Sequence, residues 1–188
     1  MSQIPPRVVL TGAESTGKTT LARYLAQKLG LPYAPESARH YLDARLSVNP
    51  DFELAAEDVL PIAYAGRATE LWLESTTVGE CLICDTDVLS TIVYAREIYG
   101  FESHELEILL HNRPATLYLL LDTDIGWTSD PTPGQRGGFE SRAQFHALFR
   151  RELEERNLPF ELVSAGGDIE ERTAKALGIV QSVLNPVL

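Results

Sequence analysis

Short apolar runs alternate with amphipathic stretches along most of this sequence. Five runs have the composition of buried strands: residues 7–10, 31–34, 81–84, 115–121 and 160–163. The segments between these runs repeat apolar residues at helical spacing. Because strand and helix alternate along the chain, we expect an α/β fold with a doubly wound, five-stranded parallel sheet.

Capping residues predict where several helices begin and end. The first helix carries Leu21, Tyr24, Leu25 and Leu29 on one face, and we expect it to end before Gly30. Glycine favours that position because the residue after a helix often has a left-handed conformation.

Three later helices show start signals. We expect Asp58 to cap a helix that tolerates Pro61 in its first turn and buries Trp72 in an apolar stripe. The spacing of a capping box recurs at residues 141–144 and 168–171.

Residues 122–142 form a polar stretch that contains proline and glycine and interrupts the alternation. Loops of this length in compact folds are usually functional lids or disordered segments. A chain of 188 residues has the length of one domain. We therefore expect a single domain over residues 1–188 with a lid at about residues 122–142.

Residues 12–20 contain the phosphate-binding pattern Gly-x-x-x-x-Gly-Lys-Thr, between a predicted strand and a predicted helix. The glycines let the backbone curl so that its amides point at phosphate oxygens, with the positive end of the helix behind them. Lys18 would bind the β- and γ-phosphates, and the hydroxyl of Thr19 would bind Mg²⁺. The residues expected to hold ATP are Gly12, Ala13, Glu14, Ser15, Thr16, Gly17, Lys18, Thr19 and Thr20.

Two aspartates follow the third predicted strand, in the sequence CLICDTD. Phosphoryl-transfer sites commonly hold Mg²⁺ with a carboxylate at the end of such a strand, and we expect Asp85 to be that residue. Asp87 is expected either to contact the substrate or to cap the next helix.

Glu36 and Arg39 follow the second predicted strand, at the edge of the sheet where open α/β sheets bind ligands. Glu36 could accept the proton of a substrate hydroxyl as the γ-phosphoryl group moves to it. Arg39, on the same helical face, could hold the acceptor or the phosphoryl group. The alternative is that Glu36 caps or begins a helix and Arg39 pairs with it in solvent, a pair that would contribute little stability.

The lid carries further candidates. Arg136 and, secondarily, Arg142 could meet the charge that develops during phosphoryl transfer when a lid closes. Trp127 is the expected stacking partner for a flat ring, with Tyr33 and Tyr64 as further members of an aromatic slot.

Charge and cysteine content limit the partners and the cellular setting that we expect. The net charge of −11 argues against sequence-independent binding to nucleic acid. No apolar run approaches the length of a membrane span, and no apolar signal segment opens the chain. We expect Cys81 and Cys84 to be unpaired core residues in a reducing, cytoplasmic protein. The expected partners are ATP and a small molecule.

The absence of two motifs limits the classes of nucleotide-binding protein that fit the sequence. The guanine-selecting pattern Asn-Lys-x-Asp is absent, which disfavours a GTPase, and no strand ends in Asp-Glu, which argues against an ordinary AAA-type motor. Two interpretations stay open. One is a kinase for a nucleoside-like metabolite, and the other is an ATPase that acts as a regulatory or binding module.

Several of these segments together resemble a known family. The stretches VVLTGAESTGKTTLARYLA, PESAR and CDTDVLST, with the lid residues Trp127, Asp130 and Arg136, resemble the ribosylnicotinamide kinase domain of NAD-biosynthesis proteins, of the NadR type. The resemblance covers about residues 7–184. It implies a fold like that of nucleoside-monophosphate kinases and Mg²⁺- and ATP-dependent phosphorylation of the 5′-hydroxyl of nicotinamide riboside, which gives nicotinamide mononucleotide. It also implies that Glu36, Asp85 or Asp87 handles the riboside and that Trp127 lies against the pyridinium ring.

Overall fold

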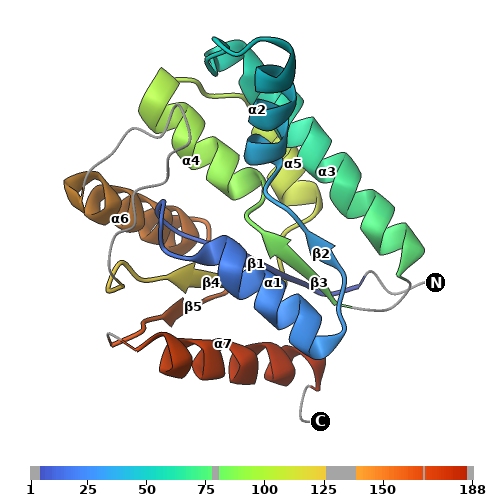
Figure 1. Cartoon of the computed structure of the whole chain (residues 1–188), viewed down its shortest axis with the longest axis vertical. Helices are drawn as coiled ribbons and strands as arrows, with labels where there is room; N and C mark the ends of the chain where they lie inside the picture. The colour runs from blue at the N-terminus through green and yellow to red at the C-terminus, as the bar shows by residue number, and fades with distance from the viewer. Residues whose placement is uncertain (1–4, 78–80, 126–138, 167, 186–188) are drawn as a thin grey trace.

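The computed structural model describes residues 5–77, 81–125, 139–166 and 168–185, with side chains from residue 142 onward in the helix that begins at 139 (Figure 1). The strands are β1 (Arg7–Thr11), β2 (Tyr33–Ala34), β3 (Leu82–Asp85), β4 (Leu117–Leu121) and β5 (Phe160–Val163). The helices are α1 (Lys18–Leu29), α2 (Ser37–Val48), the 3₁₀ turn η1 (Ala56–Asp58), α3 (Val59–Thr76), α4 (Val88–Tyr99), α5 (His104–Asn112), α6 (Phe139–Glu155) and α7 (Ile169–Leu184).

All five strands are parallel and lie in the order β2-β3-β1-β4-β5. The predicted five-stranded parallel sheet is therefore confirmed. In the register of the sheet, Leu10 lies beside Asp85 of β3 and beside Leu119 of β4. Since parallel strands end at the same edge, the loops that follow β1 and β3 are neighbours, and ligands bind at this edge in open α/β sheets.

Helices cover both faces of the sheet, as Figure 1 shows. One apolar cluster joins the strands to α1 and α7 and includes Leu25 and Val180. The other joins them to α3, α4, α5 and α6 and includes Phe149. Cys81 belongs to the first cluster and Cys84 to the second, so the prediction of two buried, unpaired cysteines on opposite faces is confirmed. Within the described ranges, no helix is long and apolar enough to cross a membrane.

Two of the predicted helix boundaries are confirmed. Gly30 follows α1 with a φ of 67°, and its backbone N–H donates to carbonyls of the last turn. Asp168 caps α7, because its Oδ1 accepts a hydrogen bond from the backbone N–H of Glu170 at 2.8 Å. These ends depend on adjacent residues alone, which is why the sequence could predict them.

The other two predicted helix starts differ from expectation in different ways. Helix α3 begins directly after Asp58, as predicted, but the Asp58 carboxylate accepts hydrogen bonds from the backbone N–H of Ala55 and the hydroxyl of Tyr41 and makes no side-chain cap to α3. The Asp58 carboxylate binds the backbone of the 3₁₀ turn and not the backbone N–H groups of α3. Helix α6 begins at Phe139, two residues before Ser141, so Ser141 lies inside the helix and is not its cap.

The buried face of α3 also differs from the prediction. Trp72 is 64% exposed and Leu71 is 51% exposed, whereas Glu70 is buried. Glu70 points inward because it pairs with the buried guanidinium of Arg7 at 2.9 Å. Successive helical residues are about 100° apart, so this inward turn carries the next two side chains toward solvent. On α1, Tyr24 is likewise 41% exposed, at the margin of the apolar face.

Candidate active site

The loop between β1 and α1 has the backbone of a phosphate cradle. Gly12 and Gly17 have φ values of 128° and 79°, and Ser15 between them has a φ of 53°. A Cβ atom on Gly12 would lie 2.9 Å from the carbonyl oxygen of Leu121, so β4 leaves room only for glycine. The hydroxyl of Thr16 donates to the carbonyl of Ala13 at 2.8 Å and closes the loop on itself. The result is a rigid curl of amides at the start of α1, which suits an anion.

Lys18 reaches back over this loop. Its Nζ donates to the carbonyls of Gly12 at 3.0 Å and Ala13 at 2.7 Å. Burial lowers the pKa of the Lys18 ammonium, and the carboxylates of Glu36 and Asp85 oppose that shift. The ammonium is thus held at the mouth of the loop and faced by acidic groups from two other segments.

Asp85 ends β3 and is 1% exposed. Its Oδ2 accepts a hydrogen bond from the hydroxyl of Tyr33 at 3.2 Å, while its Oδ1 is buried without a hydrogen-bond partner. Burial and the carboxylate of Asp85 raise the pKa of Tyr33 to about 12. A buried carboxylate oxygen without a partner is costly, and a cation or a bound hydroxyl would satisfy it.

The donors for Mg²⁺ fit this place. Asp85 lies beside the end of β1, and Thr19 belongs to the first turn of α1, in the chain that leaves the same loop. In the part of the chain that the structure describes, no three His, Cys, Asp or Glu residues form a metal-binding group. Nucleotide enzymes hold Mg²⁺ through one or two carboxylates, phosphates and water rather than through a full cage of side chains.

Glu36 immediately precedes α2 and is half-buried. Among the neighbouring charges, its carboxylate opposes the lowering of the Lys18 pKa most strongly. Arg39 forms an ion pair with Asp43 at 3.3 Å, and both side chains are about half exposed. Arg39 therefore takes part in an exposed ion pair with Asp43 on the same helix.

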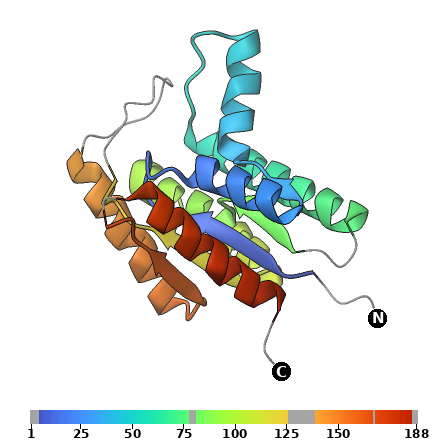
Figure 2. The ribbon, with the colours of Figure 1, turned by 60° about the horizontal axis from the view of Figure 1, so that its bottom comes forward.

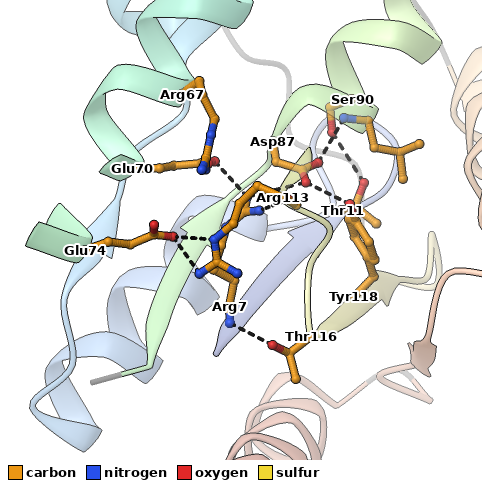
Figure 3. Close-up of polar contacts among 11 residues, drawn as sticks. Arg7, Thr11, Arg67, Glu70, Glu74, Asp87, Ser90, Arg113, Thr116 and Tyr118 are labelled. Atoms are coloured by element: carbon orange, nitrogen blue, oxygen red, sulfur yellow. Dashed lines mark hydrogen bonds and ion pairs between the residues drawn. The ribbon is translucent and has the colours of Figure 1, made fainter. Parts of the chain in front are cut away.

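Asp87 serves the protein's own structure (Figure 3). Its Oδ1 accepts from the backbone N–H of Leu89 at 3.0 Å and caps α4, and its Oδ2 accepts from the hydroxyl of Tyr118 at 2.8 Å. Arg7 lies 3.6 Å from the same oxygen. Burial raises the pKa of Asp87, and Arg7 opposes the shift. Of the two roles predicted for Asp87, the geometry supports the cap.

A buried polar network extends from Asp87 to α3. Arg7 joins Asp87 to Glu70, and Arg67 binds the other oxygen of Glu70 at 2.7 Å (Figure 3). Burial raises the pKa of Glu70, against the attraction of Arg7. Arg7 and Arg67 thereby hold the carboxylate of Glu70 in place, and Arg7 also holds that of Asp87. Glu70 and Asp87 both line a small pocket.

This pocket opens between the end of β2 and the starts of α2 and α4, directly beside Glu36. Its lining residues are Ala34, Pro35, Ser37, Ala63, Gly66, Arg67, Glu70, Thr86, Asp87, Val88 and Thr91. A Cβ atom on Gly66 would lie 2.8 Å from the hydroxyl of Ser37, so glycine keeps this wall open. The sequence interpretation did not include Arg67 and Glu70, although their i,i+3 spacing on a helix was a readable signal for an ion pair.

Two buried arginines lie on the other side of the phosphate loop. Arg142 of α6 is 2% exposed, and its guanidinium donates to the carbonyls of Ser15 and Ile125. Arg172 of α7 is 4% exposed, and its Nε and Nη2 have no hydrogen-bond partner. Burial lowers the pKa of Arg172, while Asp124 raises it. Arg142, which we ranked below Arg136, is thus in contact with the cradle, and no sequence pattern marked Arg172.

The remaining lid candidates, Trp127, Asp130 and Arg136, lie outside the described residues. Tyr64 is 49% exposed on α3 and Trp72 points to solvent, whereas Tyr33 binds Asp85. Tyr33 is therefore the aromatic candidate that the described structure brings to the site.

Comparisons with known proteins agree with this geometry. Residues 7–172 match the model of a family described as AAA domain. The structure resembles that of NadR protein in complex with nicotinamide riboside (NR), with a TM-score of 0.76 and 26% identity over 98% of this chain and 52% of that chain. It also resembles NadR protein in complex with NAD and AMP-PNP, with a TM-score of 0.74 and 22% identity over 98% and 51% of the two chains.

A third similar structure is thymidylate kinase from Ehrlichia chaffeensis, with a TM-score of 0.69 and 14% identity over 94% of this chain and 99% of that one. The chain spans about half the length of the NadR chains it matches. None of the curated proteins matches it. The predicted resemblance to the NadR-type kinase domain is confirmed, and with a family match over most of its length the chain belongs to the AAA domain family.

Proposed function

We propose that the chain is an ATP- and Mg²⁺-dependent kinase that phosphorylates the 5′-hydroxyl of nicotinamide riboside to give nicotinamide mononucleotide. The observation that carries the proposal is that the carboxylates of Glu36 and Asp85 both act electrostatically on Lys18 of the phosphate loop, beside a small pocket. A nucleotide switch would also hold Mg²⁺ through a strand-end carboxylate such as Asp85, but it needs no second carboxylate such as Glu36 beside an acceptor pocket. The complexes of NadR protein with nicotinamide riboside and with AMP-PNP support this choice of acceptor and donor.

In the proposed reaction, the loop amides and Lys18 hold the triphosphate with its terminal phosphorus toward Glu36. Glu36 accepts the proton of the riboside hydroxyl, whose oxygen forms the new bond to phosphorus. The bond from that phosphorus to the β–γ bridging oxygen breaks, and ADP leaves. Thr19 and Asp85 would hold Mg²⁺, which would supply positive charge against the phosphate oxygens.

The remaining predicted residues complete this proposal. Arg136 would meet the charge on the moving phosphoryl group, and Trp127 would stack on the pyridinium ring. Arg39 is proposed to bind the riboside, and Asp87, which caps α4 and also lines the pocket, is proposed to contact it there. The proposed setting is the reducing cytoplasm that the unpaired cysteines favour.

A riboside panel tests the proposal. ADP and phosphorylated product are measured with ATP, Mg²⁺ and either nicotinamide riboside, another nucleoside or no acceptor. We expect ADP and nicotinamide mononucleotide to form in equal amounts, and far faster with nicotinamide riboside than with thymidine. Product from another nucleoside alone would reassign the acceptor.

The family match favours a second candidate, an ATPase that acts as a regulatory or binding module. In the same assay, this function would give ADP and phosphate at a rate that no riboside changes, without phosphorylated product. That outcome would overturn the kinase proposal.

A further inference from the structure

The outer face of α3 is uncharged. Along this helix the exposed residues are Pro61, Tyr64, Ala65, Ala68, Thr69, Leu71, Trp72, Ser75 and Thr76. Every other α-helix has at least one charged residue among the exposed positions that the structure describes. Figure 1 shows α3 along the rim of the molecule. Its outer face is thus an apolar surface in contact with water.

The serine and threonine hydroxyls on this face are already paired within the helix. The hydroxyl of Thr69 donates to the carbonyl of Ala65 at 3.0 Å, and that of Ser75 donates to the carbonyl of Trp72 at 2.7 Å. Thr76 donates to carbonyls one turn back in the same way. Because these hydroxyls already donate to backbone carbonyls, a partner molecule that covered the face would leave none of the three without a hydrogen bond. The face suits contact with an apolar surface.

The order of side chains on this face is complementary to itself. Ala68 lies at its centre, with Tyr64 and Trp72 four residues away on either side and Ala65 and Leu71 three residues away. If two copies of α3 crossed antiparallel at Ala68, each Tyr64 would face a Trp72 and each Ala65 a Leu71. Such a two-fold contact pairs large with small side chains and aromatic with aromatic, and the small central residue allows close approach.

Charge limits where a second copy could bind. Two chains that each carry a charge of −11 repel one another over most of their surfaces. The repulsion is weakest where an apolar, uncharged face meets its equal, whereas a basic partner would be drawn to the acidic surface elsewhere. We propose that the chain forms a two-fold dimer through antiparallel α3 helices centred on Ala68. The contact would cover roughly 500 Å² per copy, which predicts a dimer that dissociates on dilution.

Sedimentation equilibrium tests the dimer. We expect the wild-type chain to change from monomer to dimer between about 1 and about 100 µM. Ala68→Glu places two carboxylates together at the two-fold axis and should weaken association at least tenfold. Ala174→Glu, the same change at an exposed position of α7, is the matched control and should leave association unchanged. Far-UV circular dichroism checks that both variants are folded.

Disulfide trapping tests the geometry. In a two-fold contact a residue at the axis meets its own copy, so Ala68→Cys should form a covalent dimer on oxidation, whereas Ala174→Cys should not. The native cysteines are both buried. A chain that stays monomeric throughout the range would overturn the proposal and assign the face to another partner. A dimer that survives Ala68→Glu, or an Ala68→Cys chain that does not cross-link, would overturn the α3 arrangement.

Discussion

Glu36 and Asp85 are the two carboxylates with the largest effect on the buried ammonium of Lys18, and they come from the ends of neighbouring strands. Their surroundings differ. Asp85 is fully buried, with one oxygen bound by Tyr33 and the other without a hydrogen-bond partner, whereas Glu36 is half-buried beside the pocket. This difference assigns the two residues different proposed roles, Asp85 toward Mg²⁺ and Glu36 toward the acceptor hydroxyl.

Glu36→Gln therefore tests the proposed base. The amide is close in size to the carboxylate and cannot accept the proton, so we expect kcat to fall by about 10²–10⁴, with a much smaller change in the KM for ATP. Steady-state ADP release in the presence of nicotinamide riboside measures both constants. Glu155→Gln, on the exposed side of α6, is the matched control. A Glu36→Gln enzyme with wild-type kcat would move the role of base to Asp85 or Asp87.

Asp87 and Arg142 show why single-residue roles were harder to predict than the motif around them. Asp87 has two charged or polar neighbours, Arg7 and Tyr118, that come from other strands and fix its carboxylate. Arg142 follows the lid in sequence but bonds to Ser15 of the phosphate loop. In both cases the deciding partner is far away along the chain, so local sequence carried no signal of it.

Among the elements, the loop between β1 and α1 depends most strictly on glycine. Gly12→Ala would place a Cβ atom 2.9 Å from the carbonyl of Leu121, at a φ of 128°. We expect the free energy of unfolding to fall by about 2 kcal/mol or more. Gly178→Ala is the matched control, because nothing lies within 4 Å of the added atom inside α7. It should stabilise the protein by about 0.5–1 kcal/mol.

Urea denaturation of the two glycine variants measures this difference. Equal destabilisation by both substitutions would contradict the close approach of β4 to the phosphate loop.

The contact between α5 and the end of α6 should depend on pH. Arg156, by its hydrogen bond to Glu107, lowers the pKa of that carboxyl below its ordinary value of 4.5. The ionised form is therefore favoured in the folded state, so the contribution to stability is present above about pH 4.5 and is lost as the pH falls through the lowered pKa.

We expect Glu107→Gln to reduce the free energy of unfolding by about 0.5 kcal/mol at pH 7, since the pair is partly exposed. The difference from wild type should shrink as the pH falls below 4.5 through the lowered pKa of Glu107. Denaturant unfolding at a series of pH values measures it. Glu154→Gln removes a more exposed ion pair on α6 and should change stability less at every pH. A Glu107→Gln effect that is the same at pH 3 and pH 7 would contradict the ion pair.

For the whole molecule, ATP should stabilise the fold through Lys18. With ATP and Mg²⁺ at about 100 times Kd, the gain is about 2.7 kcal/mol, which corresponds to a rise in Tm of roughly 5–10 °C for a chain of this size. Lys18→Ala should remove both this rise and the kinase activity, because the phosphates lose their ammonium partner. Differential scanning fluorimetry measures the shift.

Two comparisons make the result of this thermal experiment specific. EDTA should reduce the shift in the wild-type chain if Mg²⁺ contributes to binding. A Lys18→Ala chain that is stabilised by ATP as strongly as wild type would contradict the role of the loop.

The architecture of the whole molecule could be predicted well from the sequence. The alternation of apolar runs and helical patterns, with the glycine-rich loop after the first run, led to the parallel five-stranded sheet and to a resemblance that the NadR structures support. Predictions of which side chains are buried were less accurate in α3, where an ion pair turns one side chain inward and its neighbours outward. Glu70 turns inward to Arg7, and Trp72 consequently faces solvent.

The sequence by itself determined the order of the elements, the left-handed ends of α1 and the chemistry of the phosphate loop. These follow from residues a few positions apart, whose periodicity, capping and backbone freedom act locally. The tertiary structure alone decided that Glu36 and Asp85 meet at Lys18, that Asp87 serves as a cap, and that Arg142 and Arg172 flank the loop. The physical reason is the order of the strands, which brings together side chains from distant parts of the chain.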